Sequence, residues 1–356
     1  MNVLMPPRSF ILAFATAVCL TGAAAADEPR IGVAVPLSGP SALLGKQLRD
    51  GAHAAAAGQA ALTDVDDGCT AEGGAAAAHQ FVAAGVEIVV GFVCTEAIEA
   101  ALPILKDAAI PVVTPGVRTD SLTDRRKKTG WPVYRLAPRA DAERSAVGTL
   151  LTRLWSDALF AIVDDGTIYG RELAEGFRGA AEQSGLKPVF VDTFRPQLDN
   201  QVGLVGRIRK AGATHLFVGG DRDDIAVIER DAQALGVPLV IAGGEALRSA
   251  PGEVPLRAGT LMVGLPEWAE TADRQATEAL AKQGVIAEGY ALPGYAAMQV
   301  AIAAAVSGDA AAALDIEEFR TAIGLVRFDD KGDLSTNPYR LFHFDGARFV
   351  AATDGG

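Results

Sequence analysis

The sequence contains little histidine, little cysteine and no excess of positive charge. Its 356 residues include only four histidines, which are spread along the chain, so there is no local histidine motif for a metal. The 32 basic residues are outnumbered by 44 acidic residues, which gives a formal net charge of −12. Nucleic acids and anionic lipid surfaces both attract a basic face, so we expect neither as a partner.

Motifs of catalysis are also missing. The segment Gly39–Gln47 has the outline of a phosphate-binding loop, but its two glycines are one residue too far apart. Gln47 also stands where that loop needs a hydroxyl for magnesium. The first strand-like run is not followed by G-x-G-x-x-G, and the chain has no G-x-S-x-G nucleophile elbow. We therefore expect no enzyme activity, no metal and no cofactor.

The first 26 residues have the layout of a secretory signal peptide. Arg8 supplies a positive charge, Phe10–Leu20 is an apolar run, and Ala24–Ala26 fits the small-residue cleavage box. The apolar run is shorter than the roughly 20 residues that span a bilayer. We expect cleavage after Ala26 and a periplasmic mature protein; lipid attachment at Cys19 is the alternative.

Only Cys69 and Cys94 then remain. An even pair of cysteines in an exported chain is most simply a disulfide.

Beyond the leader, short runs of β-branched residues alternate with longer helical stretches. Runs that are apolar on both faces are typical of a parallel sheet covered by helices on both sides. They are Ile31–Val35, Glu87–Val93, Ile110–Val113, Leu159–Val163, Pro188–Phe194, His215–Val218 and Leu239–Ala242. The pattern restarts once, near Ala137 and Pro138. The sequence therefore predicts an α/β fold of two doubly wound parallel-sheet lobes.

In open α/β sheets, ligands bind beyond the carboxyl ends of the strands. This rule selects the loops Leu37–Gly45, Val93–Glu96, Thr114–Thr119, Asp164–Tyr169, Gly219–Asp224 and Gly243–Leu247. Several of these loops begin helices, whose free N–H groups suit an anionic group such as a carboxylate.

Five short motifs, in order along the chain, carry a family resemblance. They are Ile31–Pro40, the pair Asp66–Cys69 and Gly91–Cys94, Thr114–Gly116, Asp164–Gly170 and Phe328–Asp333. Together they resemble the periplasmic solute-binding proteins of ABC transporters, of the branched-chain amino-acid (leucine, isoleucine and valine) type. The resemblance covers essentially the whole mature chain.

The resemblance implies a type I periplasmic binding protein, in which two lobes joined by a three-strand hinge close on a ligand. The three crossings are expected near Ala137–Arg139, Val263–Pro266 and Phe328–Asp330. Residues 27–138 and 266–328 would then form lobe one. Residues 139–265 and 329–356 would form lobe two.

The resemblance also implies four ligand contacts. Thr95 matches a hydroxyl that binds the ligand carboxylate, and Gly116 matches a position that offers its main chain. Tyr169 matches an aromatic residue from lobe two, and Glu245 matches the acid that binds the ligand ammonium. A hydroxyl, peptide groups and one acid are the minimal chemistry for a zwitterion.

Three positions depart from the family pattern and bear on the ligand. Leu44 and Asp221 replace common aromatic residues, and Arg118 stands where the amino-acid binders usually carry threonine. An added Arg and Asp predict a more polar ligand, with a second charged or hydrogen-bonding group. The alternative is that Arg118 and Asp221 pair across the cleft as a latch.

The expected function is to capture an amino acid or an amino acid-like polar ligand for an ABC importer. A membrane permease would be the partner, and a monomer is expected. The alternative is a ligand sensor on the same fold that presents its closed form to a signalling receptor.

Overall fold

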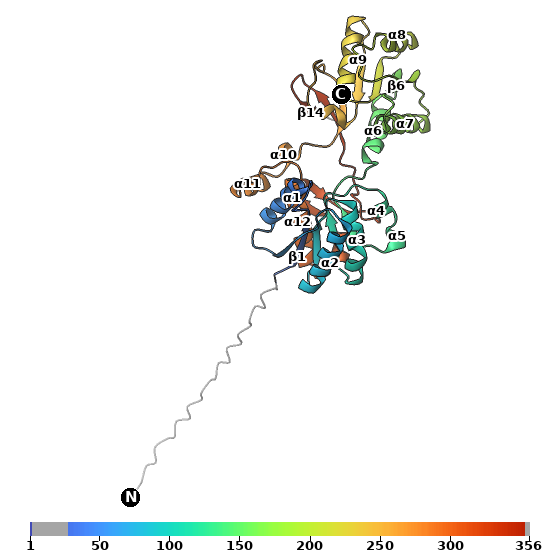
Figure 1. Ribbon diagram of the computed structural model, residues 1–356. Coiled ribbons are helices and arrows are strands. Elements are labelled where there is room, and N and C mark those ends of the chain that lie inside the picture. The colour runs from blue at the N-terminus through green and yellow to red at the C-terminus, as the bar shows by residue number, and fades with distance from the viewer. Residues whose placement is uncertain (2–27, 353–356) are drawn as a thin grey trace.

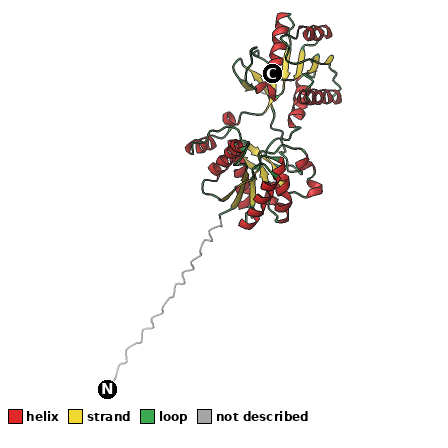
Figure 2. Cartoon of the chain, in the orientation of Figure 1, coloured by secondary structure: helices red, strands yellow, loops and turns green. Residues whose placement is uncertain are grey.

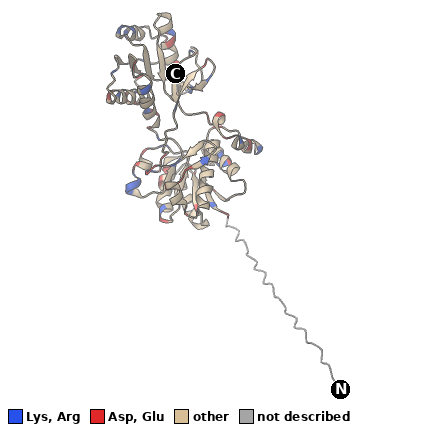
Figure 3. Cartoon of the chain, turned by 180° about the vertical axis from the view of Figure 1, so that it is seen from behind, with Lys and Arg blue, Asp and Glu red and all other residues tan. Residues whose placement is uncertain are grey.

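The computed structural model describes Met1 and residues 28–352, which fold into two α/β lobes (Figures 1 and 2). The predicted fold class is confirmed: each lobe has its own mainly parallel sheet with helices on both faces. The expected signal peptide, its cleavage after Ala26, and Cys19 lie outside the described residues. Viewed from behind, basic and acidic residues are interspersed along the helices of both lobes (Figure 3).

Lobe one is built on a parallel sheet in the order β2-β1-β3-β4-β5. Its strands are β1 (Arg30–Val35), β2 (Ala61–Asp66), β3 (Ile88–Gly91), β4 (Val112–Thr114) and β5 (Val133–Arg135). The helices from the first half of the chain are α1 (Ala42–Ala56), α2 (Ala71–Ala84), α3 (Thr95–Asp107), α4 (Ser121–Asp124) and α5 (Arg126–Thr129). A later segment adds α10 (Trp268–Thr271), α11 (Arg274–Lys282), α12 (Ala291–Val306), α13 (Ala310–Ile316) and the hairpin β11 (Phe319–Thr321) and β12 (Gly324–Val326).

The sheet of lobe one is apolar on both faces, as its sequence predicts. Val33 and Val90 pack into one core with α1 and α12, whereas Ala34 and Val89 pack into a second core with α2 and α3. Period-two alternation sends neighbouring residues to opposite faces, so both cores draw on the same strands.

Helices α1 and α12 pack closely because glycine stands at their contacts. A Cβ on Gly51 would lie 1.9 Å from the carbonyl oxygen of Ala291, and one on Gly294 would lie 2.4 Å from that of Leu48. Any larger residue would push the two backbones apart. Among residues 28–352 no single helix has the length and apolarity needed to cross a bilayer, and only the bent pair of α12 and α13, taken together, meets that criterion.

Lobe two has a sheet in the order β14-β13-β10-β9-β8-β6-β7, in which β13 and β14 run antiparallel to their neighbours. Its strands are β6 (Phe160–Asp164), β7 (Phe190–Thr193), β8 (His215–Gly219), β9 (Val240–Gly243), β10 (Leu261–Gly264), β13 (Arg340–Phe344) and β14 (Phe349–Ala351). Its helices are α6 (Ala142–Leu154), α7 (Ile168–Gln183), α8 (Val202–Ala211), α9 (Arg222–Ala234) and the 3₁₀ turn η1 (Glu245–Arg248). Strands β13 and β14 form an antiparallel hairpin.

Three segments run between the two sheets: β5 to α6, β10 to α10, and β12 to β13. The first two run through the segments Ala137–Arg139 and Val263–Pro266, whose assignment as crossings stays a prediction. The third contains Phe328–Asp330, where the last crossing is expected. Phe328 pairs with Leu334 in an isolated bridge, and Arg135 of lobe one donates to the Asp333 carboxylate from Nε at 2.8 Å and from Nη2 at 2.6 Å.

This buried ion pair holds the turn after Phe328 on lobe one. Residues 335–339 then lead into β13 of lobe two.

Candidate ligand-binding site

A hollow of about 450 Å³ lies where the two lobes meet. It takes residues from lobe one, from lobe two and from the first two crossings. Its charged lining residues are Arg118, Glu245, Arg248, Glu267 and Glu288, and Gly116 and Tyr290 also line it. Three of the seven expected site residues, Gly116, Arg118 and Glu245, thus line one hollow, although they come from loops of different sheets.

Thr95 is the first residue of α3, and its Oγ1 lies 2.7 Å from Oγ1 of Thr119. This places a hydroxyl at the N-terminus of a helix, where free N–H groups favour an anion. Thr95 is not among the residues that line the hollow.

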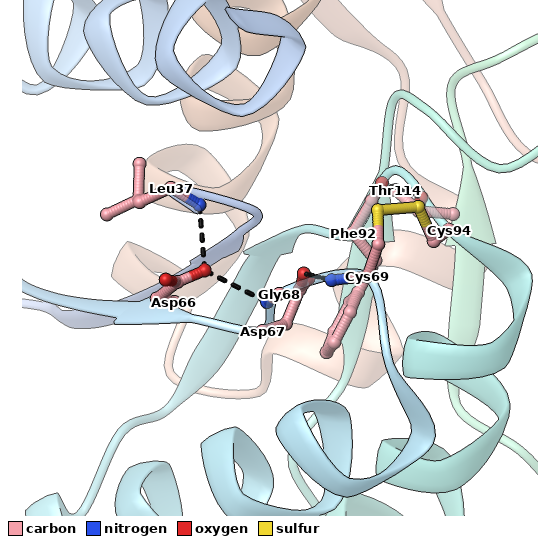
Figure 4. The surroundings of a disulfide bond; sticks show 8 residues. All are labelled: Leu37, Asp66, Asp67, Gly68, Cys69, Phe92, Cys94 and Thr114. Carbon is pink, nitrogen blue, oxygen red and sulfur yellow. Dashed lines mark hydrogen bonds between the residues drawn. A yellow bond between two sulfur atoms is a disulfide. The ribbon is translucent and has the colours of Figure 1, made fainter. Parts of the chain in front are cut away.

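The expected disulfide is confirmed. Cys69 and Cys94 are bonded, with their Cα atoms 5.2 Å apart, and Cys94 is the residue before Thr95 (Figure 4). The loop on the other side is fixed by aspartates: Asp66 accepts from the N–H of Leu37, and Asp67 accepts from the N–H of Cys69. The disulfide therefore ties the N-terminus of α3 to the loop that follows β2.

Gly116 lies in the loop after β4 and is buried against the loop after β3. A Cβ there would lie 2.7 Å from the carbonyl oxygen of Phe92 and 3.0 Å from Cα of Val93. The absence of a side chain lets the two loops touch and leaves the main chain of Gly116 at the hollow.

Arg118 is exposed and makes its hydrogen bonds toward the hinge. Its Nη2 donates to the hydroxyl of Tyr339 at 2.7 Å, and its Nε donates to the carbonyl of Pro138 at 3.3 Å. Burial raises the pKa of Tyr339 to about 12, and the nearby Arg118 opposes that rise. In the described part of the chain Arg118 has no ion pair with Asp221, so the alternative latch is not formed in this structure.

Glu143, near the start of α6, connects Tyr169 to Glu245; of these three residues only Glu245 lines the hollow. Oε1 of Glu143 accepts from the hydroxyl of Tyr169 and from the N–H of Glu245, both at 2.7 Å. The Tyr169 hydroxyl in turn accepts from the N–H of Ala246 at 3.2 Å. Burial raises the pKa of Tyr169, and the adjacent Glu143 carboxyl raises it further. Tyr169 and Glu245 are thus brought together by a residue that sequence reasoning missed.

Glu245 begins η1, and both of its carboxylate oxygens have partners. Oε1 accepts from Nε of Arg248 at 2.9 Å, and Oε2 accepts from the N–H of Leu265. Burial raises the pKa of Glu245, whereas these hydrogen bonds oppose the rise. Arg248 also pairs with Glu267 and donates to the Leu265 carbonyl. Arg248 therefore links η1 to the second crossing.

Asp221 and Leu44, like Thr95 and Tyr169, lie outside the lining of the hollow. Asp221 is exposed at the start of α9, and its side chain makes no capping hydrogen bond. Leu44 is 37% exposed in the first turn of α1. Their part in ligand binding stays a prediction.

Glu143, Tyr339 and Arg248 escaped sequence reasoning. An acid in the first turn of a helix is common because it complements the helix dipole, so Glu143 carries no local signal of a site. Tyr339 and Arg248 act through contacts with distant segments. Within residues 28–352 no group of His, Cys, Asp and Glu side chains is arranged to hold a metal.

Comparison with known proteins identifies the family. Residues 28–342 match the periplasmic binding protein family. A Leu/Ile/Val-binding protein homologue of Brucella melitensis is 29% identical over 95% of this chain and 97% of its own. A leucine-, isoleucine-, valine-, threonine- and alanine-binding protein of Pseudomonas aeruginosa is 27% identical over 91% of this chain and 92% of its own.

A solved structure of a branched-chain amino-acid ABC transporter protein from Rhodospirillum rubrum has the same fold. Its TM-score is 0.74 at 19% identity, over 91% of this chain and 99% of its own. These relatives are substrate-binding proteins and not enzymes, and the resemblance noted in the sequence is confirmed. The chain belongs to the periplasmic binding protein family.

Proposed function

We propose that the protein captures an amino acid or a similar zwitterion between its two lobes and delivers it to an ABC importer. The observation that carries this proposal is the hollow at the hinge, where Gly116 and Arg118 of lobe one lie opposite Glu245 of lobe two. Its volume of about 450 Å³ falls in the roughly 300–1,000 Å³ range of small-molecule sites.

The charges of the two walls suit the two ends of a zwitterion. Lobe one presents Arg118 and the N-terminus of α3 with Thr95, which favour a carboxylate. Lobe two presents Glu245 at the hollow, with the Glu143 carboxyl bonded to its N–H and to the hydroxyl of Tyr169, and these acids favour an ammonium. Three chain crossings permit a hinge motion that brings the walls together on the ligand.

The first test is a thermal-shift screen of the mature protein against amino acids, their amides and small carboxylates. A ligand that binds only the native state raises the unfolding temperature by mass action. We expect one chemically related group of zwitterions to stabilise the protein. Stabilisation by none of the compounds would contradict the proposal.

Delivery to a membrane permease is tested separately, in cells that carry or lack the gene. Loss of uptake of the identified ligand supports transport. Unchanged uptake with a lost transcriptional response would favour the sensing alternative.

A further inference from the structure

Glu143 is a buried acidic side chain of lobe two; it does not line the hollow itself, but it accepts a hydrogen bond from the N–H of Glu245, which does. Glu143 is 8% exposed, and its Oε1 receives both hydrogen bonds, from Tyr169 and from Glu245. Arg118 of lobe one is near enough to lower the pKa of Glu143, yet in the described part of the chain the carboxylate has no ion pair within 4.0 Å. Glu143 is therefore a buried acid without a cationic partner.

The two hydrogen bonds do not require a negative charge. A glutamine amide oxygen would accept from the same hydroxyl and the same N–H. A buried carboxylate without a cation is costly, and burial raises the pKa of Glu143 for that reason. The role of holding Tyr169 and η1 in place therefore explains why residue 143 needs an acceptor oxygen at this position. It does not explain why the side chain carries a negative charge.

The neighbouring acid is in the opposite situation. Glu245 already has a cation, because Arg248 donates to its Oε1 at 2.9 Å, and its Oε2 accepts from a backbone N–H. Of the two carboxylates joined through the Glu245 N–H, only Glu143 has negative charge left uncompensated. A cationic group arriving in the cleft would gain most by pairing with it.

We propose that Glu143 selects the ligand by charge: in the closed form its carboxylate pairs with the ammonium of the ligand, beside Glu245. This inference rests on the proposed function and deepens it. It predicts that the protein prefers an α-amino acid to the corresponding 2-hydroxy acid, and that the preference depends on Glu143.

The test compares the wild-type chain with Glu143→Gln, which keeps the acceptor oxygen and removes the charge. The matched control is Glu229→Gln in α9. Glu229 is 5% exposed, has a pKa raised by burial, and accepts from the Thr260 hydroxyl and the Arg257 N–H, away from the hollow. Thermal unfolding without ligand verifies that each variant is folded.

The proteinogenic amino acids are screened first, and the amino acid that binds best is then titrated by calorimetry beside its 2-hydroxy acid. We expect E143Q to weaken amino-acid binding about 100-fold and to leave the affinity for the 2-hydroxy acid unreduced. E229Q should change neither affinity.

If E143Q lost affinity equally for the amino acid and the 2-hydroxy acid, Glu143 would have only a positioning role, and the inference would be overturned. Unchanged amino-acid binding in E143Q would overturn it as well. In either case wild-type binding of the amino acid would leave the proposed function standing. If the wild-type chain bound no amino acid, the proposed function would fall, and this inference with it.

Discussion

Arg118 donates to the hydroxyl of Tyr339 at 2.7 Å, although 221 residues separate them in the sequence. The bond joins the loop after β4 in lobe one to the segment that enters β13 in lobe two. Arg118 also lines the hollow, so the same residue contacts the hinge segment and borders the candidate site.

We expect Arg118→Ala to remove discrimination in favour of ligands with a second acidic group. A charged hydrogen bond contributes about 1.5–3 kcal/mol, so glutamate should lose roughly 10- to 150-fold in affinity, while glutamine loses little. Calorimetry with this matched pair measures the difference. An equal loss for both ligands would assign Arg118 to the hinge instead. Tyr339→Phe serves as the control because it removes only the hydroxyl partner of Arg118.

Gly116→Ala should destabilise the protein by about 1–3 kcal/mol and weaken ligand binding, because the added Cβ would meet Phe92 and Val93 backbone atoms at 2.7 and 3.0 Å. The matched control is Gly179→Ala in α7, where a Cβ meets nothing within 4 Å. That substitution should stabilise the protein by about 0.5–1 kcal/mol, since alanine favours a helix interior. Urea unfolding of both variants gives the comparison. Equal stability of the two would refute the packing assigned to Gly116.

Replacing Cys69 and Cys94 by serine together should lower the free energy of unfolding by about 3.5 kcal/mol, because the disulfide restricts the unfolded chain over a sequence separation of 25 residues. Urea unfolding of the oxidised protein, the reduced protein and the double variant measures the effect. The reduced protein should behave like the variant. No loss of stability in either would show that the disulfide contributes nothing.

Asp124, near the first crossing, makes a pH-dependent contribution to the free energy of unfolding. It accepts from Arg139 at 3.1 Å and from Lys331 at 2.8 Å, and these hydrogen bonds lower its pKa from 3.8 to about 2. A lowered pKa means that the charged form stabilises the folded state. The advantage of the wild type over Asp124→Asn should therefore be complete above about pH 5 and disappear as the pH falls from 3.8 to 2.

Because Asp124 is largely exposed, the free energies of unfolding of the wild type and Asp124→Asn should differ by only about 0.5–1 kcal/mol at pH 7. Urea unfolding of both proteins between pH 2 and pH 7 (about one pH unit apart) follows this difference. Asp157→Asn, at an exposed position with no ion pair in the described chain, is the control. A difference that grows as the pH falls would contradict the assignment.

Much of the fold follows from local pattern. Ile88–Gly91 is a run of buried residues in a central strand, and its apolar sequence predicted that place. Ala61–Asp66 was missed because β2 is an edge strand with mostly polar or exposed residues, and it pairs only with β1. The segment between Gly51 and Cys69 therefore contains an edge strand.

Relations between distant residues could not be predicted in the same way. The Arg135–Asp333 pair, for example, joins residues 198 positions apart, and no local pattern predicts it. Glu143 was missed because only the folded wall brings it to Tyr169 and Glu245. The loop rule did select the segments that carry Gly116, Arg118 and Glu245, since it depends on sheet topology alone.

Native mass spectrometry of the mature protein, incubated with a mixture of the proteinogenic amino acids, tests most directly whether the two lobes hold a zwitterion. The account predicts a one-to-one complex with one amino acid or a small related group, lost on denaturation. A spectrum that contains only the unliganded protein would contradict it.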